Sequence, residues 1–134
     1  MEKRRKNGAD TRFSLTARLK SFRNAFSGIT ALIKYEHNAR IHLFILLLVI
    51  AAGVILAVSL FDWIAIAFAS GLVFMSECFN TAVEYLSDVV SPEDNEKIRI
   101  AKDAAAAGVL ISAIVSVIIG IIVFLPKIYQ LLIS

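Results

Sequence analysis

Three long apolar segments dominate the chain and limit what it can fold into. Residues 41–60 contain no charged side chain apart from His42, and residues 104–126 contain none. Residues 63–87 form a third segment, interrupted by a few polar residues near its end. A helix rises about 1.5 Å per residue, so each segment can cross a hydrocarbon layer of about 30 Å. The sequence predicts an all-α membrane protein with transmembrane helices at about 40–60, 63–87 and 101–125.

A water-soluble helical bundle is the alternative fold. The chain has 134 residues, of which 58% are hydrophobic, compared with roughly 45–50% in ordinary soluble domains. Helices of a small soluble bundle show a polar face along much of their length, and stretches such as LLVIAAGVILAV show almost none. About forty mostly polar residues precede the first apolar run, which argues against a signal peptide. The single cysteine, Cys78, excludes an intrachain disulfide and a cysteine-cluster metal site.

Basic residues gather near the N-terminal end. The first forty residues contain ten of the fourteen Lys and Arg residues and three acidic residues, whereas the rest contains four basic and eight acidic residues. Three more basic residues lie in the link between the second and third apolar segments, and Lys127 lies near the C-terminus. Because Lys and Arg accumulate on the cytoplasmic side of membrane proteins, we expect the N-terminus and this link in the cytoplasm and the C-terminus outside.

The basic leader contains a second pattern. Six apolar residues recur at spacings of three and four, which places them on one stripe of a helix with basic residues beside it. The pattern predicts an amphipathic helix over about 12–35 on the inner leaflet, with a coiled-coil seam as the alternative. Residues 1–11 are predicted to form a basic disordered tail. No nucleic-acid partner is expected, because no aromatic platform or binding motif accompanies the charge. The stripe consists of Leu15, Leu19, Phe22, Phe26, Ile29 and Ile33.

The end of the second apolar segment, SECFNTAVEYLSD, contains four regularly spaced polar residues. Glu77, Asn80, Glu84 and Asp88 fall within about 80° of one another on a helix, so they share one face. If Trp63 marks the outer interface, Glu77 lies about 21 Å deeper, near the inner glycerol level, and Glu84 about 10 Å further. One carboxylate is therefore expected at the depth of a lipid hydroxyl, and the others at the depth of a water-soluble ligand.

A carboxylate within the membrane usually faces a partner or a cavity and marks function. The alternative for Glu77 is a pairing with a base, or with Asn80, that only holds helices together. Glu36 precedes the first span and can pair with Arg40 across one helical turn. Lys102 and Asp103 begin the third span, where membrane-edge anchoring is their alternative role.

Taken together, these polar groups lie at one membrane depth and suit a phosphate-handling site. Carboxylates are ligands for Mg²⁺ and a Lys side chain offsets phosphate charge. Neither GxxxxGK[ST] nor GxGxxG occurs in the sequence. If ATP binds, it is expected to bind between helices.

Three motifs carry a likeness to a known family. EHNARIHL at 36–43, ECFNTAVEYLSDVVSPE at 77–93 and AKDAAAAGVLISA at 101–113 closely resemble the prokaryotic diacylglycerol kinase family, which includes the undecaprenol kinases. The resemblance runs from about Arg18 to Lys127. It implies a homotrimeric inner-membrane enzyme, with three transmembrane helices and a surface helix in each subunit and active sites between subunits.

The resemblance also implies roles for single residues. Glu77 matches the catalytic base for the lipid hydroxyl, and Glu36 and Glu84 match the Mg²⁺-binding carboxylates. Asn80 and Glu84 match contacts to ATP. Asn80 and Glu77 would also contact the lipid substrate. Further residues that would bind ATP are Lys102, Asp103, Arg18 and Lys20.

Two departures from the enterobacterial diacylglycerol kinases resemble the branch that contains the undecaprenol kinases. In this chain Ala104 and Ala105 follow the KD motif, where the enterobacterial enzymes have a Gly-Ser pair. The second departure is Asn38 within EHNAR.

The sequence thus predicts an integral membrane lipid kinase that transfers the γ-phosphate of MgATP to the primary hydroxyl of diacylglycerol or undecaprenol. A proton- or cation-conducting oligomer lined by Glu77, Asn80 and Glu84 is the alternative. Against it, the outer half of that helix has serines as its only polar side chains. A membrane adaptor recruited through the basic leader is a third possibility, but it leaves the intramembrane Glu77 unexplained.

Overall fold

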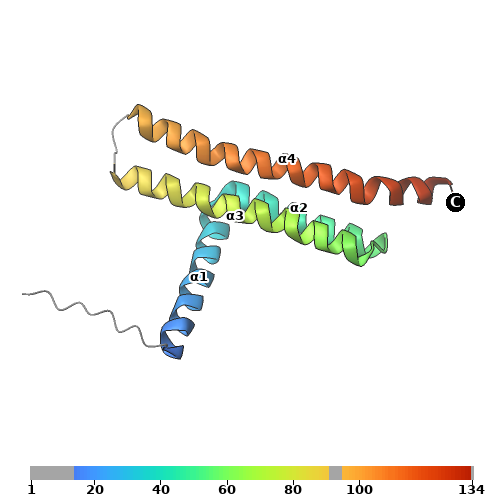
Figure 1. The fold of residues 1–134 in the computed structure, drawn as a ribbon, viewed down its shortest axis with the longest axis horizontal. Coiled ribbons are helices and arrows are strands. Elements are labelled where there is room, and N and C mark those ends of the chain that lie inside the picture. Colours follow the sequence, from blue (N-terminus) through green and yellow to red (C-terminus); the bar gives the residue numbers. More distant parts are fainter. Residues whose placement is uncertain (1–13, 91–94, 134) are drawn as a thin grey trace, which may run out of the picture.

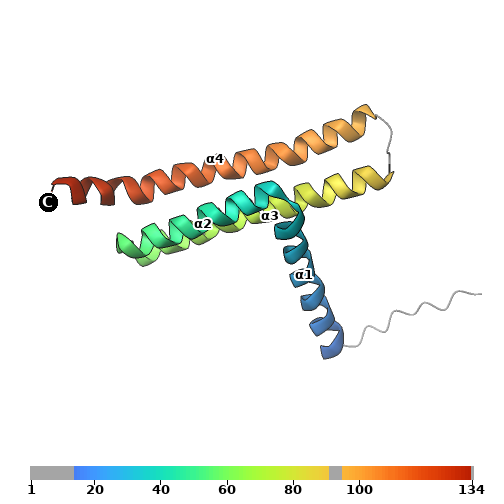
Figure 2. The same cartoon turned by 180° about the vertical axis from the view of Figure 1, so that it is seen from behind.

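The computed structural model describes residues 14–90 and 95–133, and these form four α-helices (Figure 1). The helices are α1 (Leu15–Tyr35), α2 (His37–Ile55), α3 (Leu60–Val90) and α4 (Glu96–Ile133). α2, α3 and α4 run alongside one another, and α1 projects away from them (Figures 1 and 2). The last three helices are long and apolar enough to cross a membrane. This confirms the predicted fold class. The predicted tail over 1–11 lies outside the described residues.

A single residue with extended backbone separates α1 from α2. α1 begins after Ser14, whose Oγ accepts a hydrogen bond from the Ala17 N–H at 3.3 Å. It ends at Tyr35, and Glu36 follows with φ −94° and ψ 122°. The helical path breaks here, so Glu36 lies where the projecting helix meets the first membrane-spanning helix.

Most of the predicted apolar stripe of α1 is exposed. Leu32 is the buried residue of this helix, whereas Leu19, Phe22 and Phe26 are each more than 60% exposed. An uncovered apolar stripe flanked by basic residues is typical of a helix that lies on a bilayer surface.

The turn between α2 and α3 comes earlier than predicted. α2 ends at Ile55, not near residue 60, and α3 begins at Leu60. Ala57 has φ 47°, a conformation uncommon for a residue with a side chain. Ser59 and Asp62 cap the new helix: the Asp62 carboxylate accepts from the Ser59 N–H at 2.9 Å, and the Asp62 N–H donates to Ser59 Oγ at 3.2 Å. This reciprocal pair fixes the start of α3.

α4 is longer than predicted at both ends. It begins at Glu96 because Asn95 Oδ1 caps it, accepting from the Lys97 N–H at 3.0 Å. It continues through Pro126 to Ile133, where the sequence predicted an end near residue 125. Proline removes one backbone hydrogen bond from a helix, and α4 continues past it without a break.

The apolar core lies near the α2–α3 turn. Val58, Ile66 and Val123 form its buried centre, with Trp63 and Phe124 packed against it. A Cβ atom added at Gly53 would lie 2.7 Å from Trp63 Cη2, so the indole occupies the space that glycine leaves.

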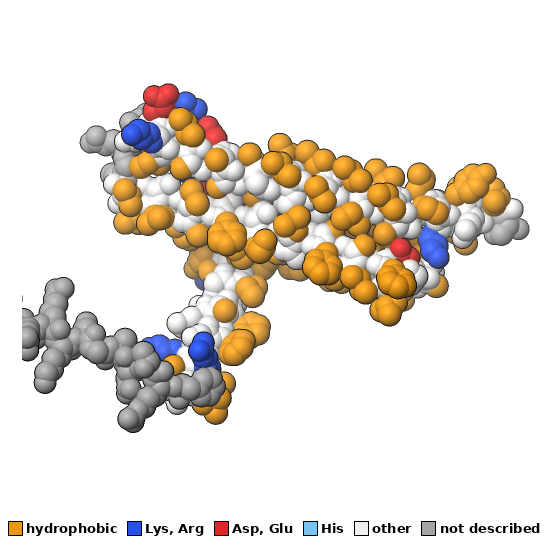
Figure 3. Space-filling view, viewed as in Figure 1, with side chains coloured by type: hydrophobic (Ala, Val, Ile, Leu, Met, Phe, Trp, Pro, Cys, Tyr) orange, Lys and Arg blue, Asp and Glu red, His pale blue; other side chains and the backbone are white. Residues whose placement is uncertain are grey.

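The outer surface fits a lipid environment. Hydrophobic side chains cover the length of the bundle on the face shown in Figure 3, and charged side chains gather toward its ends. α3 packs against both α2 and α4. Its buried residues repeat at spacings of three and four, and they change from apolar to polar along the helix: Ile66, Ala69, Val73, Glu77 and Asn80.

Candidate active site

Glu77 is the most deeply buried ionisable residue among those described. It is 1% exposed and continues the buried face of α3. His42 Nε2, on α2, lies 3.3 Å from Glu77 Oε1. This approach lacks hydrogen-bond geometry, and Oε1 has no hydrogen-bond partner in the described structure. A buried carboxylate is thus held beside a single imidazole in the half of α3 that leads toward α4.

Two further carboxylates lie close enough to Glu77 to interact with it electrostatically. They belong to Glu36 and Glu84. Glu36 comes from the α1–α2 junction and is half-buried, and the Tyr85 hydroxyl of α3 lies next to its carboxylate. The structure therefore brings Glu36, Glu77 and Glu84 to one neighbourhood, although they come from separate parts of the chain.

Asn80 joins Glu77 to Glu84 along α3. Its Nδ2 donates to Glu84 Oε1 at 2.9 Å, and the residue is 8% exposed. Asn80 Oδ1 and the neighbouring Thr81 Oγ1 are buried without a hydrogen-bond partner in the part of the chain described. Buried polar atoms are rarely left unpaired in proteins. A ligand, a water molecule or a second subunit would find unpaired hydrogen-bonding atoms here.

Lys102 and Asp103 are each paired near the start of α4. Lys102 Nζ lies 3.1 Å from Asp88 Oδ1 on α3, and Arg99 Nη1 lies 3.3 Å from Asp103 Oδ2 one turn away. The Lys102 contact gives Asp88, which the sequence left without a role, an ion-pair partner. Neither contact reaches Glu77, and Glu36 makes no ion pair with Arg40 in the described residues.

Arg18 and Lys20 lie toward the far end of α1, on the helix that projects from the bundle. Arg18 is eighteen residues before Glu36, about 27 Å away along the helix at 1.5 Å per residue. A single chain therefore does not bring these two basic residues to the carboxylates.

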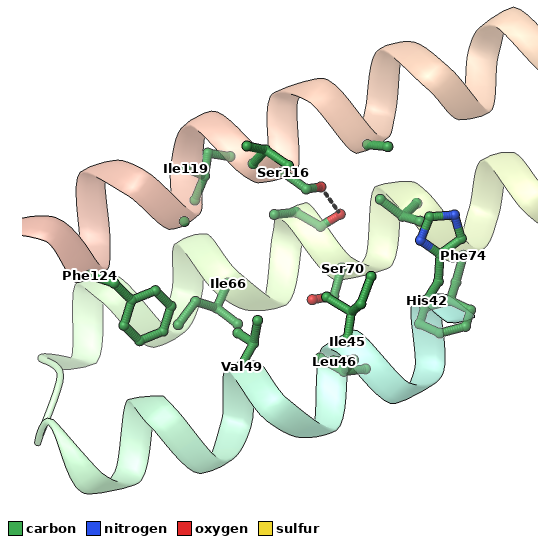
Figure 4. A pocket seen from close by; sticks show the side chains of 15 residues that line it. His42, Ile45, Leu46, Val49, Ile66, Ser70, Phe74, Ser116, Ile119 and Phe124 are labelled. Atoms are coloured by element: carbon green, nitrogen blue, oxygen red, sulfur yellow. Dashed lines mark hydrogen bonds between the residues drawn. The ribbon is translucent and has the colours of Figure 1, made fainter. Parts of the chain in front are cut away.

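An apolar cavity of about 250 Å³ lies between α2, α3 and α4, and His42, the neighbour of Glu77, is one of its lining residues. His42 and Phe74 lie at one end of it, and Ile66 and Phe124 at the other (Figure 4). Ser116, on its wall, donates to the Ala69 carbonyl oxygen at 3.1 Å. Most of the lining is aliphatic or aromatic, so the cavity offers space for hydrocarbon beside the His42–Glu77 contact.

The oxygen donors of Glu36 and Glu84 fit Mg²⁺ that is shared with phosphate. Within the described residues, no three His, Cys, Asp or Glu side chains are arranged to hold a metal ion by themselves. Mg²⁺ is usually bound by one or two carboxylates together with water and substrate phosphates. Two carboxylates in this neighbourhood meet that requirement.

Comparison with known proteins identifies the family of the chain. The prokaryotic diacylglycerol kinase family matches residues 23–124. The chain belongs to the prokaryotic diacylglycerol kinase family. This confirms the resemblance seen in the three motifs, and the match includes every predicted site residue except Arg18 and Lys20.

Two curated relatives are similar to this diacylglycerol kinase family member over most of its length. An undecaprenol kinase from Bacillus subtilis is 35% identical over 118 residues, which is 88% of this chain and 96% of that protein. A diacylglycerol kinase from Synechocystis is 37% identical over 116 residues, which is 86% of this chain and 66% of that protein. Family membership makes the chain an ATP-dependent lipid kinase of the prokaryotic inner membrane.

Two residues of this candidate site were missed from the sequence. His42 lies within an apolar span, where an ionisable residue is expected to face a partner, and that signal could have identified it. Tyr85 directly follows Glu84 and carries no comparable signal, because its position beside Glu36 depends on how α3 packs against the α1–α2 junction.

Proposed function

We propose that the protein transfers the γ-phosphate of MgATP to the primary hydroxyl of a membrane lipid alcohol, either diacylglycerol or undecaprenol. Two relatives support this proposal, because one is named an undecaprenol kinase and the other a diacylglycerol kinase. The observation that carries the proposal is the position of Glu77. A carboxylate that is 1% exposed lies on a membrane-spanning helix, beside two other carboxylates and the end of an apolar cavity.

In the proposed reaction, the lipid hydroxyl oxygen forms a bond to the γ-phosphorus while the bond from that phosphorus to the bridging oxygen of ATP breaks. The hydroxyl proton moves to the Glu77 carboxylate, which acts as general base. Asn80 orients the lipid hydroxyl beside Glu77. The products are ADP and a lipid phosphate. The apolar cavity offers space for the chain of the lipid alcohol.

Lys102 offsets negative charge on the transferred phosphoryl group, and Asp103, Arg18 and Lys20 help to hold the nucleotide. Glu36 and Glu84 would bind Mg²⁺ together with the ATP phosphates. When bound, the metal neutralises phosphate charge that would otherwise oppose attack by the hydroxyl.

We propose that the active protein is a homotrimer whose sites lie between subunits. Three observations on the single chain support this. Arg18 and Lys20 lie far along a projecting helix, and Lys102 is paired with Asp88 instead of reaching the carboxylates. Within the described residues, buried oxygen atoms of Asn80 and Thr81 also lack hydrogen-bond partners. A neighbouring subunit could supply the missing groups.

The proposed orientation places the N-terminus and the carboxylates at the cytoplasmic side, where ATP is available. The distribution of basic residues supports it. Lys127, the exception near the C-terminus, lies close enough to Asp62 at the start of α3 to interact with it electrostatically. Its charge therefore has an acidic neighbour at the opposite end of the bundle from Glu84.

The experiment is transfer of labelled phosphate from ATP by the purified, reconstituted protein, with diacylglycerol and undecaprenol offered in separate reactions. One of the two lipids is expected to become labelled in an Mg²⁺-dependent manner. Glu77→Gln keeps the shape of the side chain and removes the base, so turnover should fall by about 10²- to 10⁴-fold.

Thermal unfolding in detergent provides the control for folding, since Glu77→Gln should unfold at a similar temperature to the native chain. Labelling of neither lipid would contradict the proposed function. Near-normal labelling by Glu77→Gln would leave the kinase activity in place and remove Glu77 as its base.

A further inference from the structure

His42 is the side chain placed most directly against the proposed base. Its Nε2 lies 3.3 Å from Glu77 Oε1, and the side chains of the two residues are 20% and 2% exposed. The two residues come from different helices, α2 and α3, so the contact depends on how these helices pack. Figure 4 shows the His42 ring at the end of the apolar cavity.

We propose that His42 is a positioning residue for Glu77 in the transfer reaction. The inference rests on the proposed function, because it assumes that Glu77 is the general base. A ring N–H of His42 holds Glu77 Oε1, which restricts rotation of the carboxylate and keeps its second oxygen available to the lipid hydroxyl. The proton leaves the hydroxyl for Glu77, and no bond forms or breaks at His42.

The contacts around Glu77 favour this role. Oε1 has no hydrogen-bond partner in the described structure, so His42, at 3.3 Å, is a polar neighbour placed to restrain this oxygen. A buried acceptor without a partner is energetically unfavourable. The 3.3 Å approach is close enough to tighten into a hydrogen bond when substrate binds, as catalytic hydrogen bonds commonly do.

The reverse assignment would make His42 the base and Glu77 the group that orients it. The register of α3 argues against this. Glu77 lies on one helical face with Asn80 and Glu84, and Asn80 donates to Glu84. This places Glu77 in a continuous polar row with Glu84, one of the proposed contacts to MgATP, whereas His42 lines the cavity from the neighbouring helix.

Two substitutions at residue 42 separate these roles. His42→Gln keeps an N–H donor but cannot act as a base, and His42→Leu keeps similar bulk without a donor. For positioning, we expect His42→Leu to lower kcat by about tenfold or more, the loss typical when an orienting group is removed. His42→Gln should recover most of that loss. The KM for MgATP should stay unchanged in both variants.

His37 supplies a matched control. It lies on the same helix, is exposed, and is the other histidine of the chain. His37→Leu should retain native kcat. Thermal unfolding of each variant in detergent, with kcat expressed per folded protein, separates a loss of stability from a loss of turnover.

The outcomes distinguish this inference from the proposed function. Native kcat in His42→Leu, with Glu77→Gln inactive, would overturn the role of His42 and leave Glu77 as the base. If His42→Gln were as inactive as Glu77→Gln, His42 would not be a positioning residue. Activity in Glu77→Gln would remove the base on which both proposals depend.

Discussion

At the scale of single residues, exposure increases along one face of α3. Glu77 is 1% exposed and Asn80 8%, Glu84 is half-buried, and the Asp88 side chain is 68% exposed. Glu77, the least exposed of these residues, is thus furthest from the C-terminal end of α3, and Asp88, the most exposed, is closest to it. This gradient suits a site that joins a hydrocarbon-soluble alcohol to a water-soluble nucleotide.

Glu84 is expected to control the response to Mg²⁺. In Glu84→Gln, one of the two proposed carboxylate ligands becomes a neutral amide, which is a weaker ligand for a hard cation. The Mg²⁺ concentration at half-maximal activity should rise by roughly tenfold or more, as expected for the loss of a metal contact. The measurement is initial rate against Mg²⁺ concentration at fixed ATP.

Glu96→Gln is the matched control for that titration, since Glu96 is an exposed carboxylate in the first turn of α4. It should show the native Mg²⁺ dependence. A native Mg²⁺ dependence in Glu84→Gln itself would show that Glu84 does not hold the metal.

The shared face of Glu77, Asn80 and Glu84 could be predicted from sequence because helical geometry alone sets the angle between residues three and seven positions apart. The contact between His42 and Glu77 could not, because it joins two helices and depends on their relative rotation. The pairing of Lys102 with Asp88 has the same origin. The sequence therefore predicted which residues share a face of one helix, but it did not predict which residues meet between helices.

At the scale of helices, the packing of α2 against α3 depends on a small residue. Gly53 lets the Trp63 indole approach the α2 backbone, where a Cβ would lie 2.7 Å from Cη2. Gly53→Ala should lower stability by about 1–3 kcal/mol, the range found when extra atoms enter a packed core. Thermal or denaturant unfolding in detergent measures the change.

Gly71→Ala tests whether this effect belongs to the contact. No neighbouring atom lies within 4 Å of a Cβ built at Gly71. Since alanine favours helices more than glycine does, that variant should be neutral or slightly more stable. Equal losses in both variants would contradict the close-packing explanation for Gly53.

The helix ends were harder to predict than the helices. Length and composition sufficed to identify three spans, but the break at residues 56–59 contains neither Gly nor Pro. Its signal was Ser59 with Asp62 three residues later, a short capping pattern within an apolar sequence. Toward the C-terminus, α4 continues through Pro126, because a single missing hydrogen bond does not end a helix whose neighbouring turns continue.

At the scale of the whole molecule, one chain collects only part of the proposed site. Glu36, Glu77 and Glu84 lie near one another, whereas Lys102 is paired elsewhere and Arg18 lies on the projecting helix. If a neighbouring subunit supplies Lys102, two inactive variants should complement each other. Reconstitution of Glu77→Gln together with Lys102→Met should restore measurable phosphate transfer to lipid.

A mixture of Glu77→Gln and Glu84→Gln is the control. Both positions lie on α3 of one chain, so mixing these variants should restore little or no activity. Complementation confined to the first mixture would support a shared site. Failure of the first mixture, with both variants folded and assembled together, would place the working site within one subunit.

The four residues between α2 and α3 have a consequence for the distant His42–Glu77 contact. Because the connection is so short, neither helix can slide or turn independently of the other, and the two act as arms of one hairpin. One extra residue within either arm would displace everything beyond it by about 1.5 Å and rotate it by about 100°. The number of residues between the turn and each side chain therefore sets whether His42 and Glu77 meet. A deletion or insertion in either helix, far from the carboxylates, would misalign His42 and Glu77 without changing a reacting group.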